Sequence, residues 1–154
     1  MAITKYSYLA GVMRVCVDSV EDGCVRGRVY SPCLDGPLIF SDLAYLLLKM
    51  EAVFDRRGYP DAYQKKRSFS QTHAVQGLPP MSDEERALEA RIAQTQANTG
   101  ACATFLIRVV TRRNASWQGE IDWLGGRAPE KFESALMLLR MVHAQLFPDE
   151  WNDF

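Results

Sequence analysis

The sequence of 154 residues predicts an α+β fold made of two tandem β-β-β-α units. In both halves a glycine within a β-like stretch is followed 13 residues later by a phenylalanine, from Gly27 to Phe40 and from Gly119 to Phe132. A helix-like run begins directly after each phenylalanine. Each unit alone is too small to be comfortably stable. We therefore expect the two units to share one sheet of about six strands, with both unit helices on one face and a pseudo-twofold axis between them.

A chain of this length and composition is typical of one globular domain, residues 1–154. Ahead of each glycine, a β-like stretch carries an arginine between apolar residues, Arg14 in the first copy and Arg108 in the second. The arginine-to-glycine interval is 13 residues in the first copy and 11 in the second, which we interpret as a difference in the hairpin tip alone. The internal repeat covers residues 8–57 and 101–147, and the connector covers residues 58–100.

The first unit opens with two β-like stretches, residues 8–18 and 24–31, in which apolar and polar side chains alternate on the second stretch. Asp22-Gly23 lies between them, and this dipeptide suits a turn with positive φ. Residues 38–40 follow a proline-containing turn and are predicted to form a short third strand.

The first unit helix is predicted over residues 42–57. Ser41 is the expected N-cap, because its hydroxyl can accept a hydrogen bond from a first-turn amide. Gly58 and Pro60 are expected to end the helix. Its apolar residues recur at helical spacing and form one stripe: Leu43, Leu46, Leu47, Met50, Val53 and Phe54.

The connector divides into a long loop, residues 58–80, and a middle helix that runs to about residue 97. Ser82 and Glu85 form a capping-box pattern at the start of this helix. Only Leu88 and Ile92 are large apolar anchors on it, so we expect it to lie across the surface or to link the two copies.

The second unit repeats the order of the first, with strands predicted over residues 101–112, 117–123 and 130–132 and a helix over about 133–147. Its helix carries apolar residues where the first helix does. The positions that match in register on the return strands are Val25, Gly27, Val29 and Ser31 in one copy and Trp117, Gly119, Ile121 and Trp123 in the other.

Charge, cysteines and hydropathy restrict the class of protein. The net charge of −1 gives no overall attraction to nucleic acid or to an anionic membrane, so such binding would need a local patch. No stretch is long and apolar enough to span a bilayer and no signal-peptide pattern opens the chain, so we expect a cytoplasmic protein. The cysteines form no CxxC pair, and we expect free thiols, no metal site and no cofactor. They are Cys16, Cys24, Cys33 and Cys102.

The stretch 56–69 is the best candidate for binding a partner. Its basic side chains can neutralise phosphates while its aromatic rings offer stacking faces, as single-stranded nucleic acid requires. The same residues could contact an acidic protein surface. A solvated loop whose rings return to the core is the structural alternative. The candidate residues are Arg56, Arg57, Tyr59, Tyr63, Lys65, Lys66, Arg67 and Phe69.

A second candidate set lies on the second hairpin. Arg108 and Arg112 fit Arg-x-x-x-Arg, and Asn114, Ser116 and Gly119 fit Asn-x-Ser-x-x-Gly. Together the two patterns resemble the cyclic-diguanylate signature of PilZ domains, and this resemblance implies a ligand sensor whose arginines clamp phosphates and guanine faces. In that family a strand separates the two motifs, whereas one residue separates them here. The structural alternative is solvent-facing strand arginines followed by an Asx-type turn.

Other chemistry-bearing residues have structural interpretations. His73 and His143 have no carboxylate or thiol at a recognisable ligand or dyad spacing, although a Cys–His site assembled in space would give a small enzyme. Glu51 and Asp55 are interpreted as an exposed face of the first helix. We therefore predict no catalytic residues.

The stretch from Asn114 through Trp123 to Phe132-x-Ser134, with the following helix, is similar to a family of short uncharacterised bacterial proteins. The resemblance implies a bacterial cytosolic protein and supplies no activity. We expect a non-enzymatic binding or regulatory protein that engages a protein or a nucleic acid. We also expect its function to depend on what differs between the copies, namely the basic-aromatic exit of the first helix and the tryptophans of the second hairpin.

Overall fold

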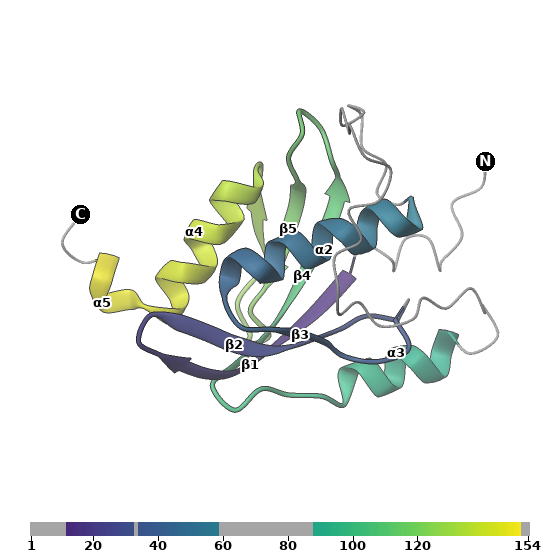
Figure 1. The fold of residues 1–154 in the computed structure, drawn as a ribbon, viewed down its shortest axis with the longest axis horizontal. Helices are drawn as coiled ribbons and strands as arrows, with labels where there is room; N and C mark the ends of the chain where they lie inside the picture. The colour runs from purple at the N-terminus through teal and green to yellow at the C-terminus, as the bar shows by residue number, and fades with distance from the viewer. Residues whose placement is uncertain (1–11, 33, 59–87, 152–154) are drawn as a thin grey trace.

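The computed structural model describes residues 12–32, 34–58 and 88–151. It has an α+β fold with six antiparallel strands in one sheet, in the order β3-β2-β1-β4-β5-β6 (Figure 1). The predicted fold class is therefore confirmed. The elements are β1 (Val12–Glu21), β2 (Cys24–Tyr30), β3 (Leu38–Phe40), α2 (Leu43–Arg57), α3 (Leu88–Gln96), β4 (Ala103–Thr111), β5 (Gln118–Asp122), β6 (Glu130–Phe132), α4 (Ala135–Leu146) and α5 (Pro148–Trp151).

The two units meet where β1 pairs with β4 at the centre of the sheet. Val17 lies opposite Gly27 on β2, and Val109 lies opposite Gly119 on β5. The second unit therefore corresponds to the first at an offset of 92 residues, with Phe132 in the place of Phe40. In the β1–β4 pairing, Arg14 lies opposite Leu106, which is its own equivalent in the second unit, so the pairing is symmetric about this point. A pseudo-twofold axis through this pair relates the halves.

The register corrects one part of the predicted repeat. At this offset Arg108 corresponds to Cys16, and Arg14 corresponds to Leu106, so aligning the two arginines was wrong by two residues. The hairpins share a β-bulge at the same position, one after Val17 and the other after Val109. Equal intervals therefore separate each bulge from its glycine, and the hairpins differ only beyond the bulge.

The recurrent glycine-to-phenylalanine spacing is a consequence of strand pairing. Gly27 lies opposite Phe40 and Gly119 opposite Phe132 in the two sheet edges. A Cβ atom at Gly27 would overlap the carbonyl oxygen of Cys16 and lie 2.9 Å from the Phe40 ring. A Cβ atom at Gly119 would overlap the carbonyl oxygen of Arg108. Both bulged hairpins thus close only around a residue without a side chain.

The hairpin tips differ in shape. The β1–β2 turn is formed by Asp22 (φ 51°) and Gly23 (φ 75°), which confirms the predicted turn with positive φ. The β4–β5 connection is wider, and Asn114 (φ 56°) and Ala115 (φ 55°) both adopt the left-handed conformation there.

Helices α2 and α4 lie on the same face of the sheet, as predicted (Figure 1). Their buried side chains, which include Leu46 and Leu138, join the apolar face of the strands in one core. The N-cap of α2 is Asp42, whose carboxylate accepts a hydrogen bond from the Tyr45 amide at 2.7 Å. The predicted cap at Ser41 is therefore wrong by one residue. Gly58 ends α2 in the left-handed conformation, as predicted.

The middle helix, α3, lies on the opposite side of the sheet from α2 and α4 (Figure 1). Two arginines on that face of the sheet hold the segment that follows it. Arg14 Nε donates to the Asn98 carbonyl at 2.6 Å, and Arg28 Nη2 donates to the Thr99 carbonyl at 2.8 Å. The Cys102 amide then bonds the Val17 carbonyl at 2.8 Å. The predicted capping box of this helix lies outside the described residues. In the described part of the chain, no helix has the length and apolar character needed to cross a membrane.

Candidate functional site

The basic-aromatic stretch predicted as a partner site is described only at its beginning. Arg56 and Arg57 lie in the last turn of α2, where their positive charges interact favourably with the negative end of the helix dipole. The remaining candidates lie outside the described residues, and they are Tyr59, Tyr63, Lys65, Lys66, Arg67 and Phe69.

The arginines of the second candidate set lie on opposite faces of the sheet. Arg108 lies on the face away from α2, where its Nη2 is 2.6 Å from a carboxylate oxygen of Glu120 on β5. The bulge after Val109 then reverses the alternation. Arg112 therefore faces α2, where its guanidinium is 2.7 Å from Asp55 and 3.2 Å from Glu51.

The other two members of that set also do not converge with the arginines. Asn114 is exposed in the turn. The Ser116 hydroxyl accepts a hydrogen bond from the Ala135 amide at 2.8 Å, so it satisfies an amide at the start of α4. The ligand clamp implied by the PilZ resemblance is thus not formed in the described structure, because Arg108 and Arg112 cannot face one ligand from opposite sides of a sheet.

Glu51 and Asp55 bind Arg112 and do not form a merely exposed helix face, so that interpretation is corrected. The buried indole of Trp117 donates its N–H to Glu51, and the Trp117 ring meets Phe54 edge-on at 5.5 Å between centroids. We call Glu51, Phe54, Asp55, Arg112 and Trp117 the Arg112 cluster. It closes the space between α2 and the β4–β5 hairpin.

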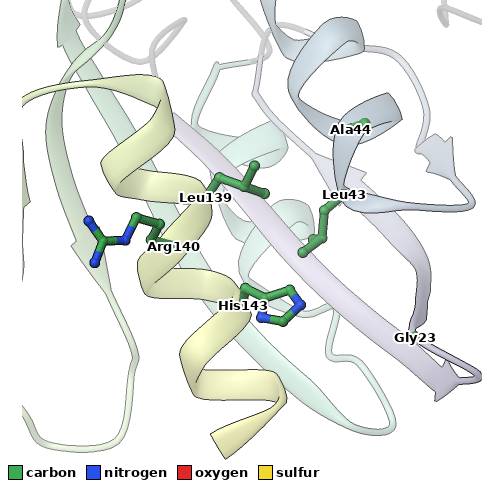
Figure 2. A pocket seen from close by; sticks show the side chains of 6 residues that line it. All are labelled: Gly23, Leu43, Ala44, Leu139, Arg140 and His143. Atoms are coloured by element: carbon green, nitrogen blue, oxygen red, sulfur yellow. The ribbon is translucent and has the colours of Figure 1, made fainter. Parts of the chain in front are cut away.

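A groove opens between the helices near the tip of the other hairpin (Figure 2). Its volume is about 340 Å³. Leu43 from α2 and Leu139 from α4 point toward each other across it. Arg140 contributes its alkyl chain and turns its guanidinium away, so the side chains facing the gap are mainly apolar (Figure 2). The lining residues are Gly23, Leu43, Ala44, Leu139, Arg140 and His143.

His143 provides the polar group at one end of this groove. Its ring stacks on Phe147 at 4.6 Å between centroids, and its Nε2 atom is 3.6 Å from a carboxylate oxygen of Glu150 on α5. These contacts hold the imidazole against the end of α4, where it lines one side of the groove.

The outer surface of the same helix layer carries exposed apolar side chains. Among the described residues, seven large hydrophobic side chains are exposed, and four of them lie on α2 and α4. Such residues concentrated beside a groove are typical of interaction surfaces. The four are Tyr45, Leu48, Leu136 and Met137.

The described thiols do not add a second site. Cys16 is buried and free, and burial raises the pKa of its thiol. Cys24 and Cys102 are exposed and free. Across the described ranges, no three His, Cys, Asp or Glu side chains are grouped so that they could hold a metal ion.

Sequence reasoning missed the groove because it directed attention to the exit of the first helix and to the second hairpin, whereas the groove lies beside the tip of the first hairpin. Val25 occupies the position in the first unit that Trp117 occupies in the second, and His143 occupies the position of Glu51. The difference between valine and tryptophan at this position was the sequence signal that the two hairpins pack differently.

Comparison of the chain with protein-family models, with curated proteins and with solved structures gave no significant match.

Proposed function

We propose that this chain is a non-enzymatic binding or regulatory protein that engages a partner protein through the layer formed by α2 and α4. The observation that carries this proposal is the groove between the helices, which lies beside exposed apolar side chains on both of them. Protein interfaces typically centre on such a desolvated apolar pocket surrounded by a larger contact area.

The lining of the groove favours binding over catalysis. Of its six residues, only Arg140 and His143 carry ionisable side chains, and the arginine turns its charged group away. The imidazole is packed between Phe147 and Glu150. General acid–base or nucleophilic catalysis requires a reacting group beside such an imidazole. The groove presents leucine and alanine there.

The chemistry of the helix layer also favours a protein over a nucleic acid. Nucleic-acid affinity comes mainly from lysine and arginine contacts with phosphates. Leu48 on α2 and Leu136 in the first turn of α4 are 60% and 67% exposed, and both would bury apolar area against a protein partner. The predicted 56–69 stretch is the competing surface, and one experiment separates the two.

The experiment uses the full chain as bait to capture partners from a lysate of the organism in which the protein occurs. Leu48→Asp and Leu136→Asp each place a charge in the proposed interface. Leu124→Asp is the matched control, because Leu124 is 43% exposed in the β5–β6 connection. We expect a partner that binds the wild type and the control but is reduced at least about tenfold by both helix variants, since a central interface residue contributes more than about 1–2 kcal/mol.

Circular dichroism of each variant confirms that the fold is retained. A partner that binds both helix variants as well as the wild type would contradict the proposal. Loss of the partner only when Lys65, Lys66 and Arg67 are changed to Glu would assign binding to the 56–69 stretch instead.

A further inference from the structure

The groove and the Arg112 cluster have one equivalent position in common, because His143, which lines the groove, corresponds to Glu51 of the cluster. At the offset of 92 residues set by the strand register, Leu139 corresponds to Leu47 and His143 to Glu51. Both places lie beside a hairpin on the helix side of the sheet. The symmetry of the fold therefore allows a direct comparison between a filled place and an open one.

In the second unit, the chain fills this place with its own aromatic side chain. Trp117 extends from the start of β5 toward α2, is 4% exposed, and donates its N–H to Glu51. Its edge-on contact with Phe54 adds ring packing to the area it buries.

In the first unit, the same position holds Val25, which is buried in the core. A valine side chain is too short to cross from the hairpin to α4, where His143 stands in the place of Glu51. Gly23 at the hairpin tip has no side chain, and a Cβ atom built there would have nothing within 4 Å, so the space beside it is open. The position of Glu51, which the Trp117 indole bonds in one half, is thus held by His143 in the other, where it lines the open groove beside Leu43 and Leu139 (Figure 2).

We infer that the groove receives one aromatic side chain, of the tryptophan or tyrosine type, from the partner protein. The inference rests on the proposed function and names the anchor of that interface. A slot between two leucines suits a flat ring, and a volume of about 340 Å³ is ample for an indole. Tryptophan and tyrosine are also the residues that most often anchor protein interfaces, because they bury a large area with few rotatable bonds.

The direct test uses N-acetyltryptophanamide as a probe for the anchor and N-acetylleucinamide as its aliphatic counterpart. Chemical shifts of the full chain are followed by NMR during each titration. We expect the tryptophan probe to shift the signals of Gly23, Leu43, Ala44 and Leu139 in a saturable manner. The leucine probe should bind at least about fivefold more weakly, because it lacks the ring contacts of an aromatic side chain.

A blocking variant with a matched control shows whether the groove itself is the site. Ala44 is exposed at the groove, so Ala44→Trp fills the space from its rim without entering the core. Ala93→Trp places the same side chain on α3, on the other side of the sheet. We expect Ala44→Trp to abolish the shifts caused by the tryptophan probe and Ala93→Trp to leave them unchanged.

Three results would overturn the inference: no saturable shift at the groove residues, equal binding of the two probes, or binding that survives Ala44→Trp. The lysate capture then separates this failure from failure of the proposed function. A partner that depends on Leu48 and Leu136 but is unaffected by Ala44→Trp would keep the helix layer as the interface and remove the aromatic anchor.

Discussion

Replacing Arg112 with methionine tests whether the Arg112 cluster holds the second hairpin against α2. The arginine is 3% exposed, and its guanidinium donates to Asp55 at 2.7 Å and to Glu51 at 3.2 Å. It also lies over the Phe54 ring, with 5.7 Å from the guanidinium carbon to the ring centroid. Methionine keeps most of the apolar stem and removes the charge.

The magnitude follows from the different exposure of the partners. Breaking a fully buried ion pair costs about 3–5 kcal/mol, because a charge is left without compensation. Here the Glu51 and Asp55 side chains are 22% and 45% exposed, so both carboxylates regain water when the arginine is removed. Glu51 also keeps the N–H of Trp117. We therefore expect a loss of about 2–3 kcal/mol, which is in the range of charged hydrogen bonds.

The assay is urea unfolding followed by circular dichroism, with thermal unfolding as a second measurement. A loss of this size lowers Tm by about 4–12 °C in a domain of this length. Arg113→Met is the matched control, because Arg113 is the exposed neighbouring arginine, and it should change the free energy of unfolding by less than about 0.5 kcal/mol. Equal effects of the two variants would refute the assigned role of Arg112.

Three further predictions concern the scaffold. Gly27→Ala should lower the free energy of unfolding in urea by about 1–3 kcal/mol or more, because the new methyl group overlaps a carbonyl of β1, and unchanged stability would disprove that close approach. Asp42→Ala should cost about 0.5–2 kcal/mol in the same assay as a lost N-cap, whereas Ser41→Ala should cost little, and the reverse order would restore Ser41 as the cap. A hydrogen bond from Arg28 lowers the pKa of Asp18, so the stability it adds is present above about pH 4 and lost as the pH falls through the lowered value. Between pH 5 and pH 2, the free energy of unfolding should therefore fall less steeply in Asp18→Asn than in the wild type. Identical slopes would show that Asp18 makes no such contribution.

The sequence predicted the two-unit sheet because its strongest signals are imposed by close packing. A glycine opposite a phenylalanine is required wherever the bulged hairpin closes, so the pair recurs at the same spacing in both copies. The apolar stripe of each unit helix is required by burial against the sheet. These requirements do not depend on details of the loops.

The faces of Arg108 and Arg112 were not predictable from spacing. Residues four apart in a regular strand share a face, so the sequence placed the two arginines together. The bulge between Val109 and Thr111 adds one residue and sends Arg112 to the helix side. A bulge has no strong sequence signal of its own, but it moves every later side chain of the strand to the opposite face of the sheet. The α2 cap was placed one residue early for a different reason, because Ser41 and Asp42 are adjacent and both can cap a helix.

The pattern of difference between the halves supports the location proposed for function. Both units share the glycine–phenylalanine pair and the buried helix stripe that the sheet and core require, and they differ at the ends of the hairpins. One end is closed by the buried Arg112 cluster, whose polar groups satisfy one another. At the other end Val25 replaces the tryptophan and His143 replaces the carboxylate, and the apolar walls remain without a side chain between them. Leaving leucine surface open to water has no benefit for folding. Burial of those walls against a partner would remove this apolar surface from water.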